Sequence, residues 1–204
     1  MKKIVFDLDD YGEFRSLDCL PILLELKERF PALKVTLFGI PYFLSPRRIA
    51  ELHETGWIEI GMHGWAHLPW GKAFSSITGE LRPGDFECKL WSNKMARRIL
   101  SSGEQMGFVK GFKAPYWAIS PAVIDALVEE GWWLADHPDN QRLLRPGLKV
   151  YFPNSAYSVH GHAWPSCGNY VGNLISNPPF EKDSRFFLIS EVLSWSAVED
   201  SHNL

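Results

Sequence analysis

The sequence has no long hydrophobic run, few cysteines and little excess charge, and each shortage argues against a class of protein. No stretch approaches the ~18 apolar residues of a membrane-spanning helix. The formal net charge is only −3, so neither a nucleic acid nor an anionic membrane is expected as a partner. The three cysteines, Cys19, Cys88 and Cys167, are odd in number and widely spaced. Free thiols in a reducing compartment are therefore expected rather than disulfides.

The N-terminus also lacks the pattern of an export signal. Residues 1–7 lead directly into an expected strand that carries candidate catalytic acids, so cleavage there would destroy the site. We therefore expect a cytoplasmic protein. The length of 204 residues, 46% of them hydrophobic, is typical of one domain with a substantial core, and we expect residues 1–204 to form a single catalytic domain.

Strand and helix patterns alternate along the chain. Strands are expected at residues 3–7, 34–39, 59–62, 110–113, 132–135, 149–152, 157–160 and 186–189. Helices are expected at residues 16–30, 45–55, 86–102 and 120–131. Residues 68–85 and 164–184 are expected to be loops, which often carry specificity. Repeated βα units predict an α/β fold with a parallel sheet or barrel.

Two histidines four residues apart, His63 and His67, follow one of the expected strands. If the chain turns into a helix there, both side chains lie on one face and can bind one divalent metal. A third ligand is expected from Asp9 or Asp10, at the carboxyl end of the first strand, where α/β folds bind ligands. Alone, an HxxxH pair arises by chance, and an acidic cluster is more often a solvated turn. Together at strand ends, the two features favour a metal site.

Five short segments occur in one order along the chain. They are Leu8-Asp9-Asp10, His63-Gly-Trp-Ala-His67, Phe112-Lys-Ala-Pro-Tyr116, Trp132-Trp-Leu-Ala-Asp136 and Tyr157-Ser-Val-His-Gly-His162. This pattern resembles the polysaccharide deacetylase family, also called the NodB-homology domain or carbohydrate esterase family 4. The resemblance runs from about residue 4 to residue 162. It implies a distorted (β/α) barrel that hydrolyses N-acetyl groups of amino sugars with a divalent metal.

The resemblance also implies roles for individual residues. Asp9 would be the general base, and Asp10 would bind the metal together with His63 and His67. Zn²⁺ is the first expectation for this oxygen and nitrogen set, with Co²⁺, Ni²⁺ and Fe²⁺ as alternatives. The backbone N–H of Tyr116 would support the developing oxyanion.

The proton donor to the leaving amine would be His160 or His162, of which His160 fits the family pattern better. Its carboxylate partner is expected to be Asp136, although a strand-end Asp that caps a turn is an equal alternative. Lys113 stands where the family has Arg, and Lys cannot copy the bidentate geometry of Arg. Lys113 can still place a positive charge beside Asp9 and keep it ionised.

Several functions stay open on the sequence alone. The leading one is deacetylation of an N-acetylated saccharide or its precursor by a cytoplasmic or virus-encoded enzyme. The alternatives are hydrolysis of a non-sugar amide by the same fold and a saccharide-binding barrel with weakened catalysis. A purely structural metal site is disfavoured, because such sites use four protein ligands, usually including Cys. The sequence does not indicate the oligomeric state.

Overall fold

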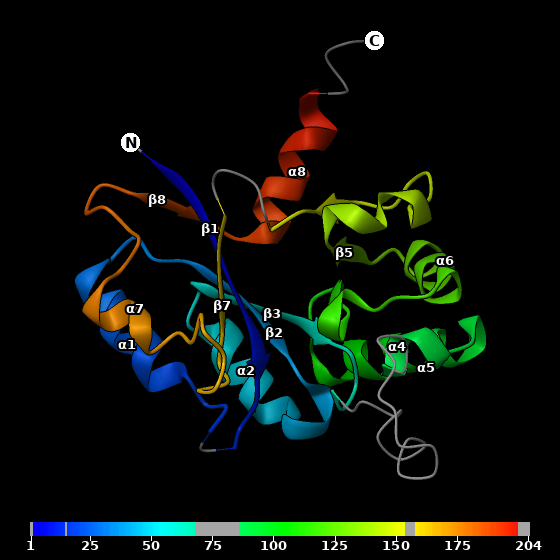
Figure 1. Cartoon of the computed structure of the whole chain (residues 1–204), viewed down its shortest axis with the longest axis horizontal. Helices are drawn as coiled ribbons and strands as arrows, with labels where there is room; N and C mark the ends of the chain where they lie inside the picture. Colours follow the sequence, from blue (N-terminus) through cyan, green and yellow to red (C-terminus); the bar gives the residue numbers. More distant parts are fainter. Residues whose placement is uncertain (1, 15, 68–85, 154–157, 200–204) are drawn as a thin grey trace.

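A computed structural model describes residues 2–14, 16–67, 86–153 and 158–199 (Figure 1). Its strands form one parallel sheet in the order β6-β5-β4-β3-β2-β1-β7, and β8 also pairs with β1. The strands are β1 (Lys3–Tyr11), β2 (Val35–Gly39), β3 (Ile58–His63), β4 (Gly111–Lys113), β5 (Trp133–Ala135), β6 (Val150–Tyr151), β7 (Ser158–His162) and β8 (Arg185–Phe187). The expected α/β fold with a parallel, barrel-like sheet is confirmed.

Helices connect most of the strands. They are α1 (Leu20–Arg29), α2 (Pro46–Glu54), α4 (Glu87–Leu90), α5 (Asn93–Met106), α6 (Pro121–Glu129), α7 (Asn173–Ser176) and α8 (Ile189–Glu199). Three of them begin after a serine whose hydroxyl accepts a backbone N–H from the first turn, namely Ser45, Ser92 and Ser120. The Ser-Pro pairs at 45–46 and 120–121 therefore start helices as expected.

Several expectations along the chain need correction. The strand expected at residues 3–7 continues to Tyr11, and the helix expected at residues 16–30 begins at Leu20. The single helix expected at residues 86–102 is two helices, because the chain is extended at Trp91 and Ser92 and restarts with Ser92 as the cap of α5. The loop expected at residues 164–184 contains α7. The strand expected at residues 186–189 ends at Phe187, and Ile189 begins α8. The loop expected at residues 68–85 lies outside the described residues.

The sheet is apolar on both faces, as a parallel sheet covered on both sides should be. The larger core includes Phe6, Leu37 and Ile60 and packs against the connecting helices. A smaller cluster on the other face contains Val5 and Phe38 and is covered by Ile189 and Leu193 of α8. β8 leads directly into α8 and pairs with residues 3–5 at the start of β1, so α8 lies at the end of the sheet opposite to the end of β1 (Figure 1).

A buried carboxylate ties α8 to the sheet. Glu59 of β3 accepts hydrogen bonds from the Thr36 hydroxyl (2.6 Å) and from both the backbone N–H (3.2 Å) and the hydroxyl (2.5 Å) of Ser190. These contacts satisfy a charged group that would be costly to bury unpaired. None of the helices in the described ranges is long and apolar enough to cross a membrane. All three cysteines are free, as expected.

Candidate active site

The acids at the end of β1 owe their placement to a break in strand regularity. In a regular strand, neighbouring side chains point to opposite faces, so Asp9 and Asp10 would be separated by the sheet. The register between β1 and β2 shifts between Leu8 and Tyr11, and Asp10 has a φ of 66°. Both carboxylates consequently line one cavity of 360 Å³.

His63, at the end of β3, and His67, in the loop that follows, both contact the carboxylate of Asp10. His63 ends β3, and its Nδ1–H donates to the backbone carbonyl of Lys113 (3.1 Å), which leaves Nε2 3.4 Å from Oδ1 of Asp10. Nε2 of His67 lies 3.0 Å from the same oxygen. Residues 64–67 are a loop rather than the expected helix turn. The shared face expected from helical spacing is therefore wrong, although the two side chains do converge.

Glu87, at the start of α4, holds this histidine loop in place. Its buried carboxylate accepts hydrogen bonds from the backbone N–H groups of Trp65 (2.8 Å), Ala66 (3.2 Å) and His67 (3.1 Å). A Cβ on Gly64 would overlap the Glu87 carboxylate, and Gly64 has a φ of 62°. No motif pointed to Glu87, because its partners are backbone groups about twenty residues away.

Asp10, His63 and His67 fit a divalent metal ion. Their ligand atoms lie within 4.8 Å of one another. Oδ1 of Asp10 is buried and accepts no hydrogen bond from the described residues, although two imidazole nitrogens face it. Burial raises the pKa of Asp10, but the His162, His63 and His67 rings outweigh burial and bring that pKa well below its usual value. One carboxylate and two imidazoles that leave coordination positions open are typical of a hydrolytic metal site.

Lys113 lies fully buried between two carboxylates and two aromatic rings. Nζ is 2.7 Å from Oδ1 of Asp9 and 3.0 Å from Oδ2 of Asp7. It also lies 5.0 Å from the ring centre of Phe38 and 4.4 Å from that of Trp117. Burial lowers the pKa of Lys113, but Asp7 and Asp9 outweigh burial and raise it. The expected proximity of Lys113 to Asp9 is confirmed.

His160 and His162 both face the cavity from β7. Nδ1 of His160 is 2.7 Å from Oδ2 of Asp7, and its Nε2 is 3.7 Å from Oδ2 of Asp9. Nδ1 of His162 is 2.7 Å from Oδ2 of Asp10. Burial lowers the pKa of His162, but Asp10, with a smaller effect of Asp9, raises it overall. Nδ1 of His160 thus contacts Asp7, whereas Nδ1 of His162 contacts Asp10.

The expectation that Asp136 is the carboxylate partner of the proton donor is wrong. Asp136 accepts hydrogen bonds from the backbone N–H of His137 (2.8 Å) and from the amide of Asn140 (2.8 Å), and Asp7 is the carboxylate that contacts His160. Two-residue alternation on β1 could have identified Asp7, since it shares a face with Asp9. The sequence alone did not pair β1 with β7.

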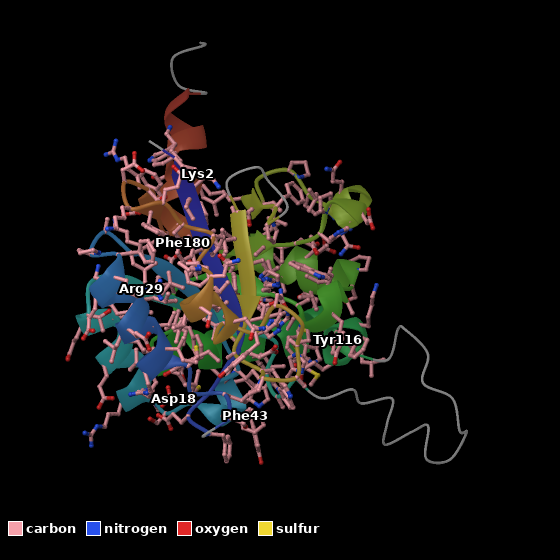
Figure 2. All side chains as sticks on the ribbon, turned by 60° about the vertical axis from the view of Figure 1, so that its left-hand side comes forward. Lys2, Asp18, Arg29, Phe43, Tyr116 and Phe180 are labelled. Atoms are coloured by element: carbon pink, nitrogen blue, oxygen red, sulfur yellow. The ribbon has the colours of Figure 1, made fainter. Side chains whose placement is uncertain are left out.

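Unusual backbone geometry is concentrated at this cavity. The non-glycine residues with positive φ in the described chain are Asp10, His67, Tyr116 and Trp117, and all four line it. Such conformations are costly and persist where the surroundings impose them, often at functional sites. The side chain of Tyr116 lies at the surface (Figure 2), is 64% exposed and stacks on Phe86 at 4.1 Å.

Comparisons with known proteins identify the fold. No family model and no curated protein matches the sequence. Among solved structures, a family 4 acetyl xylan esterase from Clostridium thermocellum in complex with a cobalt ion matches with a TM-score of 0.61 at 14% identity, covering 96% of this chain and 92% of that one. The peptidoglycan deacetylase PdaC from Bacillus subtilis matches with a TM-score of 0.58 at 12% identity, covering 99% and 95%.

A third similar structure is a CE4 family pseudoenzyme from Bacillus anthracis, with a TM-score of 0.55 at 17% identity over 94% of this chain and 66% of that one. At these identities the likeness concerns the fold alone. The fold expected from the resemblance to carbohydrate esterase family 4 is confirmed. Since the similar structures include a pseudoenzyme, the activity has to be argued from the site.

Replacing Glu87 by Ala should destabilise the protein by about 2–4 kcal/mol, because three backbone N–H groups lose their buried acceptor. Chemical denaturation measures the loss, and Glu54→Ala on the exposed end of α2 is the matched control. A loss below about 1 kcal/mol, similar to that of a surface substitution, would show that these N–H groups find other acceptors.

Proposed function

We propose that this protein is a metal-dependent hydrolase that removes the N-acetyl group of an amino sugar in a saccharide or its precursor. One observation carries the proposal. Three metal-ligating atoms of Asp10, His63 and His67 converge beside a second carboxylate, Asp9, which a buried Lys113 holds separately. A binding site has no need of this second carboxylate, whereas hydrolysis needs a base next to the metal.

Asp10, His63 and His67 would hold one divalent ion, with Zn²⁺ as the first choice and Co²⁺, Ni²⁺ and Fe²⁺ as alternatives. When bound, such an ion polarises a carbonyl group and lowers the pKa of a water molecule. The hydrogen bond from Nδ1 of His63 to the Lys113 carbonyl fixes the tautomer that presents Nε2.

Asp9 is the base in this proposal. Asp9 is 4% exposed and lines the cavity. Lys113 contacts its Oδ1, so that Oδ2 is the oxygen closer to the imidazoles. Asp9 accepts a proton from water as the water oxygen attacks the amide carbon. The backbone N–H of Tyr116, in its imposed positive-φ conformation, would stabilise the oxyanion that forms.

His160 is the proton donor in this proposal. Its Nδ1–H is donated to Asp7, so Nε2 faces the cavity near Asp9. In its charged form, His160 gives the Nε2 proton to the amide nitrogen, the C–N bond breaks, and the amine and acetate leave. His162 instead contacts Asp10, the proposed metal ligand, and would orient that carboxylate.

The proposed saccharide substrate is supported by the size and lining of the cavity. A volume of 360 Å³ is near the lower end for ligand sites and suits one substituted ring. Trp117 lines the cavity, and the stacked pair of Tyr116 and Phe86 lies beside it. Aromatic faces offer sugar rings contact area at little entropic cost. The similar structures described as acetyl xylan esterase and peptidoglycan deacetylase act on saccharides, which agrees with this choice.

Acetate release from a panel of N-acetylated saccharides, O-acetylated xylan and non-sugar amides, measured together with metal content, tests the proposal. Release from at least one N-acetylated saccharide, dependent on the metal, is the expected result. Release from a non-sugar amide alone would favour an amidohydrolase of the same fold. Binding of saccharides without release would indicate a binding barrel, comparable to the pseudoenzyme among the similar structures.

His63→Ala should lower metal affinity more than about 100-fold, since even residues that only support ligands cost 10–100-fold when lost. Isothermal titration with Zn²⁺ measures the affinity. His53→Ala on α2 is the matched control, because His53 contacts the Gly107 carbonyl away from the site. Equal affinities for the two variants would remove His63 from the ligand set.

Asp9→Asn should keep the metal and lower kcat by about 10²–10⁴-fold, because an amide of nearly the same size cannot accept the proton of water. Metal content and turnover are measured on the same preparation. If the variant instead loses its metal and keeps its fold, Asp9 is a ligand and the roles of Asp9 and Asp10 are exchanged.

Replacing each of the two histidines of β7 should cause a different defect, a loss of turnover for His160 and a loss of metal affinity for His162. His160→Ala should lower kcat by about 10²–10⁴-fold with the metal retained, because the proton donor is gone. His162→Ala should lower metal affinity by about 10–100-fold, because Asp10 loses the contact that orients it. The opposite pairing of defects would make His162 the donor.

A further inference from the structure

Asp7 is a fully buried carboxylate that neither donates nor accepts a proton in the proposed reaction. It lies in the middle of β1, two residues before Asp9, and none of its surface is exposed. Its neighbours in the sheet are Thr36 of β2 and His160 of β7, each directly in register. An ionised carboxylate at such a position is expensive to bury unless cations or hydrogen bonds compensate for the lost water.

The compensation comes from two residues of the proposed machinery. Oδ2 of Asp7 accepts hydrogen bonds from Nδ1 of His160 (2.7 Å) and from Nζ of Lys113 (3.0 Å). Burial raises the pKa of Asp7, and the charge of Lys113, followed by the contact with His160, outweighs burial and lowers that pKa. Asp7 is therefore an anion held by these two side chains.

Through these two contacts, Asp7 affects two groups that line the cavity, the ring of His160 and the carboxylate of Asp9. Nδ1 of His160 lies 2.7 Å from Oδ2 of Asp7 and 3.4 Å from Nζ of Lys113. Since the nearer group is a carboxylate that can only accept, the neutral ring carries its proton on Nδ1, and Nε2 is turned toward Asp9 at 3.7 Å. Lys113 spans the two carboxylates, with Asp7 on one side and Asp9 at 2.7 Å on the other. A single carboxylate oxygen thus fixes the ring of His160 and the ammonium group that holds Asp9.

We propose that Asp7 is a positioning residue for hydrolysis, and that it sets the orientation of His160 and shares Lys113 with Asp9. It takes the place that the sequence pattern assigned to Asp136, which contacts His137 and Asn140 instead. The proposal rests on the proposed function only for the role of His160 as proton donor. The alternative is that Asp7 merely neutralises Lys113 and has no effect on the imidazole.

The test compares Asp7→Asn with Asp136→Asn, which makes the same chemical change in another buried carboxylate at the carboxyl ends of the strands. In the ¹⁵N-labelled chain of 204 residues, NMR reports which imidazole nitrogen of neutral His160 carries the proton, with His160→Gln used for assignment. The wild type and Asp136→Asn should show the Nδ1–H tautomer. Asp7→Asn should lose this preference, lower kcat by about 10²–10⁴-fold and leave KM and metal content nearly unchanged.

A His160 tautomer that is the same in Asp7→Asn and the wild type, with unchanged kcat, would overturn the proposal. So would a tautomer that changes in Asp136→Asn alone. Should Asp7→Asn not fold, the wild-type spectrum decides, since an Nε2–H tautomer contradicts donation to Asp7. If the wild type releases no acetate from any substrate, the proposed function fails, while the tautomer still tests the contact.

Discussion

The ion pairs of the buried Lys113 ammonium group with Asp7 and Asp9 hold the site together. The ammonium group lies inside the sheet, paired with Asp7 and Asp9 of β1 and flanked by Phe38 and Trp117. Removing one partner of such a cluster leaves an uncompensated buried charge, which typically costs several kcal/mol. The positions of the proposed base and of β1 relative to β4 are therefore fixed by the same group, and in this role Lys113 makes single contacts with two carboxylates.

The buried carboxylate of Glu87 supports the histidine loop of residues 64–67 in a comparable way. It binds the backbone of residues 65–67 and occupies the space beside Gly64. His67, whose backbone N–H donates to Glu87, has a positive φ, a conformation that persists where the surroundings impose it. Glu87 thus holds a proposed ligand in position without taking part in the proposed reaction. A preorganised site requires rigid support of this kind.

The fold by itself does not decide the activity. Structures with this fold include an acetyl xylan esterase, a peptidoglycan deacetylase and a pseudoenzyme, all below 20% identity to this chain. The distinction lies in individual side chains. The proposed hydrolysis depends on Asp9 and His160, whose Oδ2 and Nε2 atoms lie 3.7 Å apart and which have separate partners, Lys113 and Asp7.

The sequence by itself determined the order of the strands, the Ser-Pro helix starts and the candidates Asp9, Asp10, His63, His67, Lys113, His160 and His162, because these follow from local patterns, but it did not show α7 or α8. It did not determine the break at Trp91, the loop conformation of residues 64–67 or the partner of His160. Only the tertiary structure decided these, because Asp7 meets His160 across 153 residues and Glu87 meets the histidine loop across about 20. Such contacts depend on strand register and burial, which no local pattern encodes.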